Sequence, residues 1–108
     1  MPEPTEAVRE KATLQPGENL SQQFRTLASG HVEFNLTSSS GSMTVVVIKK
    51  SDYVAYSNGE PVPQLYTYRN QTEFKDMVHF LEGFFVVTII CEDPDPCAFQ
   101  FKVIRNPR

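Results

Sequence analysis

The stretch that decides the fold is LEGFFVVTIICEDPDPCAFQFKVI, residues 81–104. It contains two runs of strand length, 84–91 and 97–104, which are rich in β-branched and aromatic residues and are separated by the acidic, proline-containing segment 92–96. The second run alternates large apolar residues with smaller or polar ones, which is the period-two pattern of a strand. We therefore predict two antiparallel strands joined as a hairpin.

Similar patterns occur along the rest of the chain. Residues 31–37 alternate apolar and polar side chains, and MTVVVI at 43–48 is almost continuously apolar, as expected for a central strand. Further strands are predicted at 20–28, 53–56, 65–68 and 72–80. The apolar spacing of the last segment also fits a helix, and a strand is preferred because the segment runs directly into the strand that follows Glu82-Gly83. About seven or eight short strands without a long helix predict an all-β fold, an antiparallel β-sandwich or jelly-roll.

The first thirteen residues differ in composition from the rest. Residues 1–13 (MPEPTEAVREKAT) contain two prolines and five charged side chains, and few apolar groups that a core can bury. Such a composition does not offset the entropy lost on ordering. We predict a flexible N-terminal arm over 1–13, followed by a single β-sandwich domain over 14–108.

Net charge argues against binding to nucleic acid, and the length of the apolar runs argues against membrane insertion. Ten Lys and Arg residues against thirteen Asp and Glu give a net charge of −3, and the only basic cluster is the pair Lys49 and Lys50. Binding to nucleic acid needs a concentrated basic face, so no nucleic-acid partner is expected. No apolar run approaches the roughly 18 to 20 residues that cross a bilayer, so no membrane insertion is expected either.

The order of these features resembles a known family. A PGEN turn at 16–19 precedes SGHVEFNLTSSSGSMTVVVI at 29–48, and residues 81–104 close the pattern. This arrangement resembles the β-sandwich of bacterial pre-peptidase C-terminal domains and, more loosely, GOLD domains of trafficking and lipid-transfer proteins. The resemblance covers about residues 14–104 and implies a non-catalytic accessory or interaction module. The bacterial family carries acidic residues after the glycine turn, whereas here Ser42, Met43 and Thr44 follow Gly41; a cation site that depends on those acids is not carried over.

Two cysteines, Cys91 and Cys97, bracket the segment 92–96. If they face each other at the base of the loop, a disulfide is geometrically reasonable and contributes roughly 2 kcal/mol on a chain-entropy argument. The alternative is a pair of reduced, partly buried thiols.

Three carboxylates, Glu92, Asp93 and Asp95, are concentrated in the same segment. Oxygen ligands of this kind can hold Ca²⁺ if carbonyls and waters complete the shell. The alternative, a solvated turn, is favoured because the segment lacks the glycine-containing spacing of a calcium loop. No other cofactor is expected.

Four tyrosines flank the proline-containing loop 57–64: Tyr53, Tyr56, Tyr66 and Tyr68. Tyrosines gathered at one end of a sandwich can stack on a sugar or form a protein-binding patch. The alternative is that they roof the core beneath the loop.

Nothing in the chain points to catalysis. The two histidines, His31 and His79, lie outside any hydrolase or zinc motif, and there is no G-x-S-x-G nucleophile context. We predict a non-enzymatic binding or accessory module that recognises a protein or glycan partner through the loops 51–68 and 92–96.

Two other functions stay open. One is a structural or self-assembling protein that pairs through an edge strand at 65–68, with the oligomeric state left undetermined, and the other, less favoured, is a small hydrolase. The cysteine pair, together with three N-x-S/T sequons at Asn19, Asn35 and Asn70, slightly favours an extracellular or secretory setting over the cytoplasm.

Overall fold

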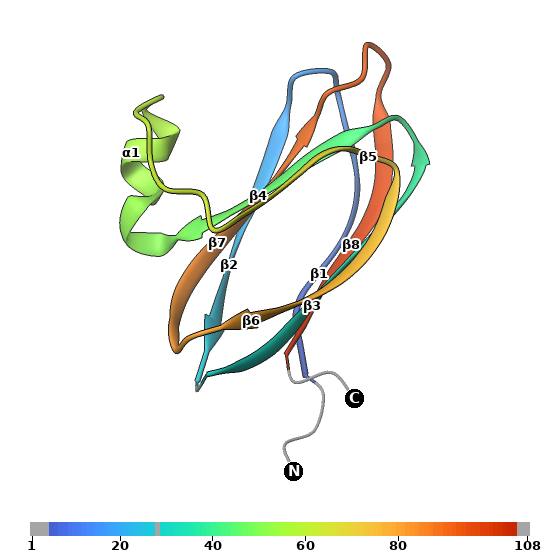
Figure 1. The fold of residues 1–108 in the computed structure, drawn as a ribbon. Helices are drawn as coiled ribbons and strands as arrows, with labels where there is room; N and C mark the ends of the chain where they lie inside the picture. Colours follow the sequence, from blue (N-terminus) through green and yellow to red (C-terminus); the bar gives the residue numbers. More distant parts are fainter. Residues whose placement is uncertain (1–4, 28, 106–108) are drawn as a thin grey trace.

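The computed structural model describes residues 5–27 and 29–105, and within them the chain forms eight strands, one 3₁₀ turn and one short α-helix (Figure 1). The strands are β1 (Thr5–Leu14), β2 (Asn19–Thr26), β3 (Gly30–Ser40), β4 (Met43–Lys49), β5 (Tyr66–Gln71), β6 (Glu73–Phe80), β7 (Gly83–Cys91) and β8 (Cys97–Arg105). Between β4 and β5 the chain forms the 3₁₀ turn η1 (Lys50–Asp52) and the helix α1 (Tyr53–Ser57). None of the helical segments in the described residues is long and apolar enough to cross a membrane.

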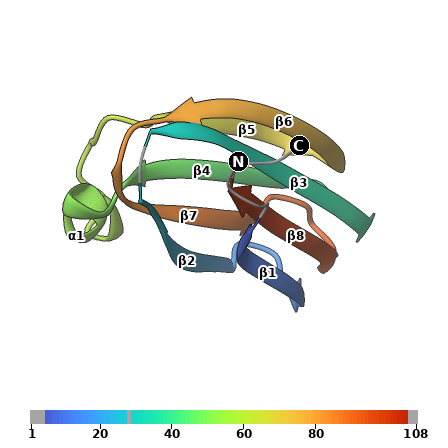
Figure 2. The ribbon, with the colours of Figure 1, turned by 90° about the horizontal axis from the view of Figure 1, so that it is seen from below.

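The strands form two four-stranded antiparallel sheets, ordered β1-β8-β3-β6 and β2-β7-β4-β5. Every connection except the one between β4 and β5 passes from one sheet to the other, which is the strand order of a jelly-roll. The sheets lie face to face, with β1 beside β2 at one edge and β6 beside β5 at the other (Figure 2). The predicted all-β antiparallel sandwich is confirmed.

The flexible arm predicted over residues 1–13 is wrong where the structure describes it. β1 pairs with β8 from Thr5 to Leu14, with one bulge, and the side chains of Val8 and Leu14 are buried in the core. An edge strand needs only a few apolar side chains on one face, because the ladder with its neighbour satisfies its backbone hydrogen-bonding groups. Residues 1–4 lie outside the described residues.

The hairpin predicted from residues 84–104 is also wrong, although both strands exist. β7 pairs with β2 and β4, whereas β8 pairs with β1 and β3 in the other sheet. The segment 92–96 therefore crosses between the sheets. Alternation identifies a strand and its buried face, but not the strand with which it pairs.

A third correction concerns residues 53–56, predicted as a strand and observed in α1. Tyr53 and Tyr56 are three residues apart, so in a helix they lie on the same face. Both pack against a small cluster formed by Val46, Ile48 and Val86 on the outer face of the β2-β7-β4-β5 sheet. Figures 1 and 2 show α1 to one side of the two sheets.

The main core lies between the sheets and is rich in phenylalanine. Phe34 is fully buried, and its ring centroid lies 6.2 Å from that of Phe24, 5.9 Å from that of Phe80 and 6.3 Å from that of Phe101. Since these rings come from β2, β3, β6 and β8, one aromatic cluster ties both sheets together.

Candidate functional site

A groove of about 870 Å³ opens at the end of the sandwich where β6 turns into β7, on the side that carries α1. Three parts of the chain, far apart in sequence, form its walls: the end of β4 with the turn into α1, the start of β5, and the β6–β7 turn. The lining residues are Lys49, Lys50, Ser51, Val54, Leu65, Tyr66 and 79–85.

Three large apolar side chains at the groove are exposed to solvent. Val54 and Leu81 are each 70% exposed and Phe84 is 46% exposed. Phe84 is outside the core because its neighbour Phe85 pairs with Phe24 on the inner face, and successive side chains of a strand alternate between faces. Clustered exposed apolar groups of this kind mark interaction sites in soluble proteins.

The rim of the groove is basic, although the whole chain carries a net charge of −3. The guanidinium carbon of Arg25 lies 4.9 Å from the centroid of the Phe84 ring, and the Nζ of Lys50 lies 5.4 Å from it. Both distances are within the range of a cation–π interaction. With Lys49 also on the lining and Glu82 the one carboxylate there, the described residues place a local excess of positive charge beside the apolar surface.

Intramolecular contacts hold β5 and β6 together where they form one wall of the groove. The hydroxyl of Tyr66 donates a hydrogen bond of 3.0 Å to the carbonyl oxygen of His79, and the Tyr66 ring packs on Phe80 with centroids 5.3 Å apart. The N–H of Leu65 donates to the carbonyl oxygen of Val47. These contacts fix the start of β5 against both neighbouring strands, so the groove is preformed.

The four tyrosines singled out in the sequence do not gather on one surface. Tyr53 and Tyr56 belong to α1 and pack against the outer face of the β2-β7-β4-β5 sheet. Burial there, followed by the neighbouring Tyr53 hydroxyl, raises the pKa of Tyr56. Tyr66 and Tyr68 pair with Val47 and Val45 and pack against the inner core, closing the edge between β5 and β6. Of the four, only Tyr66 lines the groove.

Tyr68 is tied to the neighbouring sheet by its hydroxyl. It donates a hydrogen bond of 2.7 Å to Oδ2 of Asp76, and its ring stacks on Phe74 with centroids 4.4 Å apart. Burial, followed by the hydrogen bond to Asp76 and the charge of that carboxylate, raises the pKa of Tyr68 well above its usual range.

We expect Tyr68 to remain protonated at a pH where an unperturbed tyrosine has ionised. Since its pKa is raised in the folded state, its stabilising contribution is complete below the unfolded pKa of about 10 and is lost as the pH rises through the folded value. The variant Tyr68→Phe should lose about 1 kcal/mol of stability at neutral pH and show a smaller further loss at alkaline pH. Urea unfolding at a series of pH values, with ultraviolet difference spectra to count ionised tyrosines, checks this; an alkaline profile identical to that of the wild type would contradict it.

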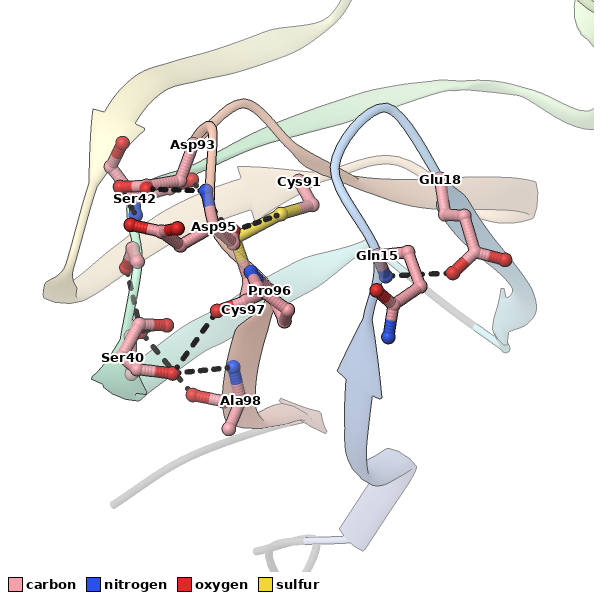
Figure 3. Close-up of a disulfide and its surroundings, with 12 residues drawn as sticks. Gln15, Glu18, Ser40, Ser42, Cys91, Asp93, Asp95, Pro96, Cys97 and Ala98 are labelled. Carbon is pink, nitrogen blue, oxygen red and sulfur yellow. Dashed lines mark hydrogen bonds between the residues drawn. A yellow bond between two sulfur atoms is a disulfide. The ribbon is translucent and has the colours of Figure 1, made fainter.

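The disulfide predicted between Cys91 and Cys97 is present, with the two Cα atoms 5.8 Å apart and both side chains buried (Figure 3). Cys91 ends β7 and Cys97 begins β8, so the bond joins one sheet to the other at the base of the crossing loop. The disulfide therefore links the two sheets, and it does not join two paired strands of a hairpin.

The carboxylates of this loop have structural partners. Oδ2 of Asp93 accepts a hydrogen bond from the N–H of Ser42, and Oδ1 accepts one from the N–H of Asp95 (Figure 3). The side chains of Glu92 and Asp95 are exposed. Within residues 5–27 and 29–105 no three His, Cys, Asp or Glu side chains converge as a metal site. The Ca²⁺ site considered for Glu92, Asp93 and Asp95 stays a prediction.

Replacing both cysteines by serine is expected to lower the free energy of unfolding by about 2 kcal/mol, because the closed loop is short and the constraint on the unfolded chain is correspondingly modest. Chemical denaturation of wild type and variant, each with and without reductant, measures the difference. Reductant should reproduce the loss in the wild type and leave the variant unchanged. Equal stability of the oxidised wild type and the variant would contradict the expectation.

Sequence reasoning missed most of the groove. The sequence identified Lys49 and Lys50 as the only basic pair. Arg25, Val54 and Leu81 lie in three separate segments, and no local pattern predicts that these segments share a surface. One local pattern does indicate an exposed aromatic side chain here. Phe84 and Phe85 are adjacent after the turn at 81–83, and adjacent side chains of a strand point to opposite faces, so only one of the two can point into the core.

No family model matches the chain, and no curated protein matches it. Among solved structures, the chain is similar to the pre-peptidase C-terminal domain of collagenase from Bacillus anthracis, with a TM-score of 0.70 and 12% identity over 90% of this chain and 88% of that one. A second similar structure is a carbohydrate-binding module from Cellvibrio mixtus lichenase 5A, in complex with cellotriose, with a TM-score of 0.48 and 12% identity over 96% of this chain and 91% of that one. The predicted resemblance to pre-peptidase C-terminal domains is thus confirmed at the level of the fold, and the looser resemblance to GOLD domains stays a prediction.

Proposed function

We propose that this chain is a non-enzymatic binding module that holds an aliphatic, acidic segment of a protein partner in the groove between α1 and the β6–β7 turn. The observation that carries the proposal is the combination of exposed Val54, Leu81 and Phe84 with a basic rim. Of the two loop regions predicted to bind, 51–68 contributes both of its ends to this groove, and 92–96 is not among the lining residues.

The chemistry of the groove favours a protein segment over a glycan. Sugar rings stack on free, flat aromatic faces, and Phe84 is the one exposed aromatic among the large apolar side chains of the described residues. The cationic groups of Arg25 and Lys50 already lie over its ring. Val54 and Leu81 offer aliphatic surface that matches Leu, Ile or Val of a partner, at about 25 cal/mol per Å² buried.

The charges at the rim favour an acidic partner. Lys49, Lys50 and Arg25 stand beside the apolar surface with one carboxylate, Glu82, among them. Complementary charge chiefly sets partner choice and association rate, while the apolar contacts supply the affinity. An aliphatic segment that carries Asp or Glu satisfies both requirements.

Peptide titration tests this function. Two pools of short synthetic peptides, with equal aliphatic content and with either Asp and Glu or Lys and Arg, are added to the ¹⁵N-labelled full chain. We expect the acidic pool alone to shift amide signals, confined to Arg25 and to residues 49–54, 65–66 and 79–85. Equal shifts from the basic pool, or shifts elsewhere, would contradict the proposal, and shifts of these amides by cellotriose instead would favour a glycan.

Matched substitutions sharpen the test. Val54→Glu and Leu81→Glu place a carboxylate in the groove and should each weaken binding of the acidic peptides at least about tenfold, which is about 1.4 kcal/mol. Met77→Glu makes the same change at an exposed apolar residue outside the groove lining and should leave binding unchanged. Loss of binding in all three variants would point to a general charge effect and overturn the assignment of the site.

The self-assembling alternative has one observation in its favour: β5 is an edge strand. This edge is short and carries Asn70 at a positive φ of 53°, which disturbs a regular ladder. We therefore expect a monomer in sedimentation experiments over a wide concentration range. Dimers that Thr67→Pro abolishes would favour the alternative.

The disulfide supports an extracellular or secretory setting, because structural disulfides persist chiefly in oxidising compartments. The mass of the alkylated protein isolated from its native source tests this: an intact bond blocks alkylation of both cysteines, and two alkylated cysteines would contradict the proposed setting.

A further inference from the structure

Two histidines face each other on the solvent side of the β1-β8-β3-β6 sheet. His31 of β3 and His79 of β6 are directly paired in the ladder, and both are exposed. Their ring centroids are 5.6 Å apart and the ring planes stand at 81°. These are the only histidines in the 108 residues, so the fold brings together both imidazoles of the chain from positions far apart in sequence.

The separation suits a shared metal ion. An imidazole nitrogen binds a first-row metal at about 2.0 to 2.1 Å, and two rings on one ion then have centroids on the order of 5 Å apart. The observed separation differs from this by less than an ångström, which rotation of two exposed side chains can close. No backbone movement is needed.

The backbone beneath the pair is firmly placed. Val32 and Phe80, which adjoin the two histidines in sequence, point inward and are buried. The carbonyl oxygen of His79 also accepts the hydrogen bond from Tyr66, which anchors this end of β6 to the other sheet. Because the ladder already fixes the relative position of the two strands, metal binding costs mainly the rotamer freedom of two imidazoles.

The neighbouring side chains limit the ligand set to these two nitrogens. Glu33 lies on the same face two residues along β3, but its carboxylate is 3.7 Å from the Nζ of Lys75. Within residues 5–27 and 29–105, no third His, Cys, Asp or Glu side chain completes a metal site. Water or an added ligand therefore fills the remaining positions.

We propose that His31 and His79 form a two-imidazole surface site for a divalent first-row transition metal, with Cu²⁺ bound most tightly. Imidazole nitrogens suit Cu²⁺, Ni²⁺ and Zn²⁺, and the Irving–Williams order places Cu²⁺ first. Ca²⁺ and Mg²⁺ require oxygen ligands and are excluded by the ligand type. This inference does not rest on the proposed peptide binding, although His79 also lines the groove.

Titration of the full chain with CuCl₂, followed by calorimetry and electron paramagnetic resonance, tests the site. We expect one Cu²⁺ per chain, with hyperfine coupling to two imidazole nitrogens. His31→Gln and His79→Gln should each weaken binding at least about tenfold, and the double variant should lose the two-nitrogen signature. Glu33→Gln alters a neighbouring carboxylate that is not a ligand and should leave the signature intact.

Thermal unfolding provides a second measurement. The pair exists only when β3 and β6 are paired, so saturating Cu²⁺ should raise the Tm of the wild type and not that of either single variant. Unchanged affinity in a single variant, or a two-nitrogen signal that persists in the double variant, would overturn the site. Val54→Glu, which tests the groove from α1, should bind Cu²⁺ as the wild type does, so the two proposals fail separately.

Discussion

Replacing Phe34 by alanine is expected to lower the free energy of unfolding by about 4 kcal/mol, the largest effect of any change considered for this chain. The ring is fully buried and packs against Phe24, Phe80 and Phe101, which come from three other strands. Its removal takes apolar surface out of the core and leaves a cavity at the centre of the aromatic cluster that joins the two sheets. A rigid pair of sheets cannot collapse fully around such a cavity.

Urea unfolding followed by far-ultraviolet circular dichroism measures this loss. Phe84→Ala serves as the control, because Phe84 is also a phenylalanine in a strand but is half exposed on the outer face; it should lose no more than about 1 kcal/mol. Phe34→Leu, which refills much of the volume, should lose less than about half as much as Phe34→Ala. Equal losses for Phe34→Ala and Phe84→Ala would contradict the description of the core.

Replacing Gly41 by alanine is expected to destabilise the fold by about 3 kcal/mol. Gly41 lies at the end of β3 with a φ of +83°, a conformation that L-residues adopt at a cost of about 1 kcal/mol or more. A Cβ atom built there would also lie 2.6 Å from Sγ of Cys97. That sulfur is buried and held by the disulfide, so it has little freedom to move away.

A matched control separates the two causes. Gly59 has nearly the same φ, +81°, but a Cβ there would meet nothing within 4 Å. Gly59→Ala should therefore cost only the conformational strain of about 1 kcal/mol. In a background that carries Cys91→Ala and Cys97→Ala, the part of the excess cost that comes from the sulfur should disappear, while the 3.2 Å contacts with Cα and Cβ of residue 97 remain. A full excess in that background would contradict the proposed contact with Sγ.

The strand pattern itself could be predicted from local sequence. Residues 31–37, 43–48 and 97–104 lie in β3, β4 and β8 as the alternation and the apolar run predicted. Alternation is a property of the strand alone, since successive side chains point to opposite faces whichever strand lies alongside. The disulfide was one of two outcomes considered for Cys91 and Cys97, and it was suggested because only five residues separate them.

Three features could not be predicted because they depend on distant parts of the chain. Residues 5–14 are too polar to order alone and become a strand through the ladder with β8. Residues 53–57 form a helix because Tyr53 and Tyr56 cover an apolar patch on the outer face of the sheet. The loop 92–96 crosses between sheets because β7 and β8 each find partners far away in sequence.

The candidate sites divide in the same way. The sequence showed one basic pair and two histidines outside any motif. It did not indicate that either set of residues belongs to a site. Only the jelly-roll order brings Lys50, Val54, Leu81 and Phe84 to one groove and pairs His31 with His79 on one face. The amino-acid sequence by itself determined the strands that contain 31–37, 43–48 and 97–104 and the faces that they bury, because these follow from short-range periodicity. The tertiary structure alone decided sheet membership and both candidate sites, because strand pairing is settled by hydrogen bonds and burial between segments that are remote in sequence.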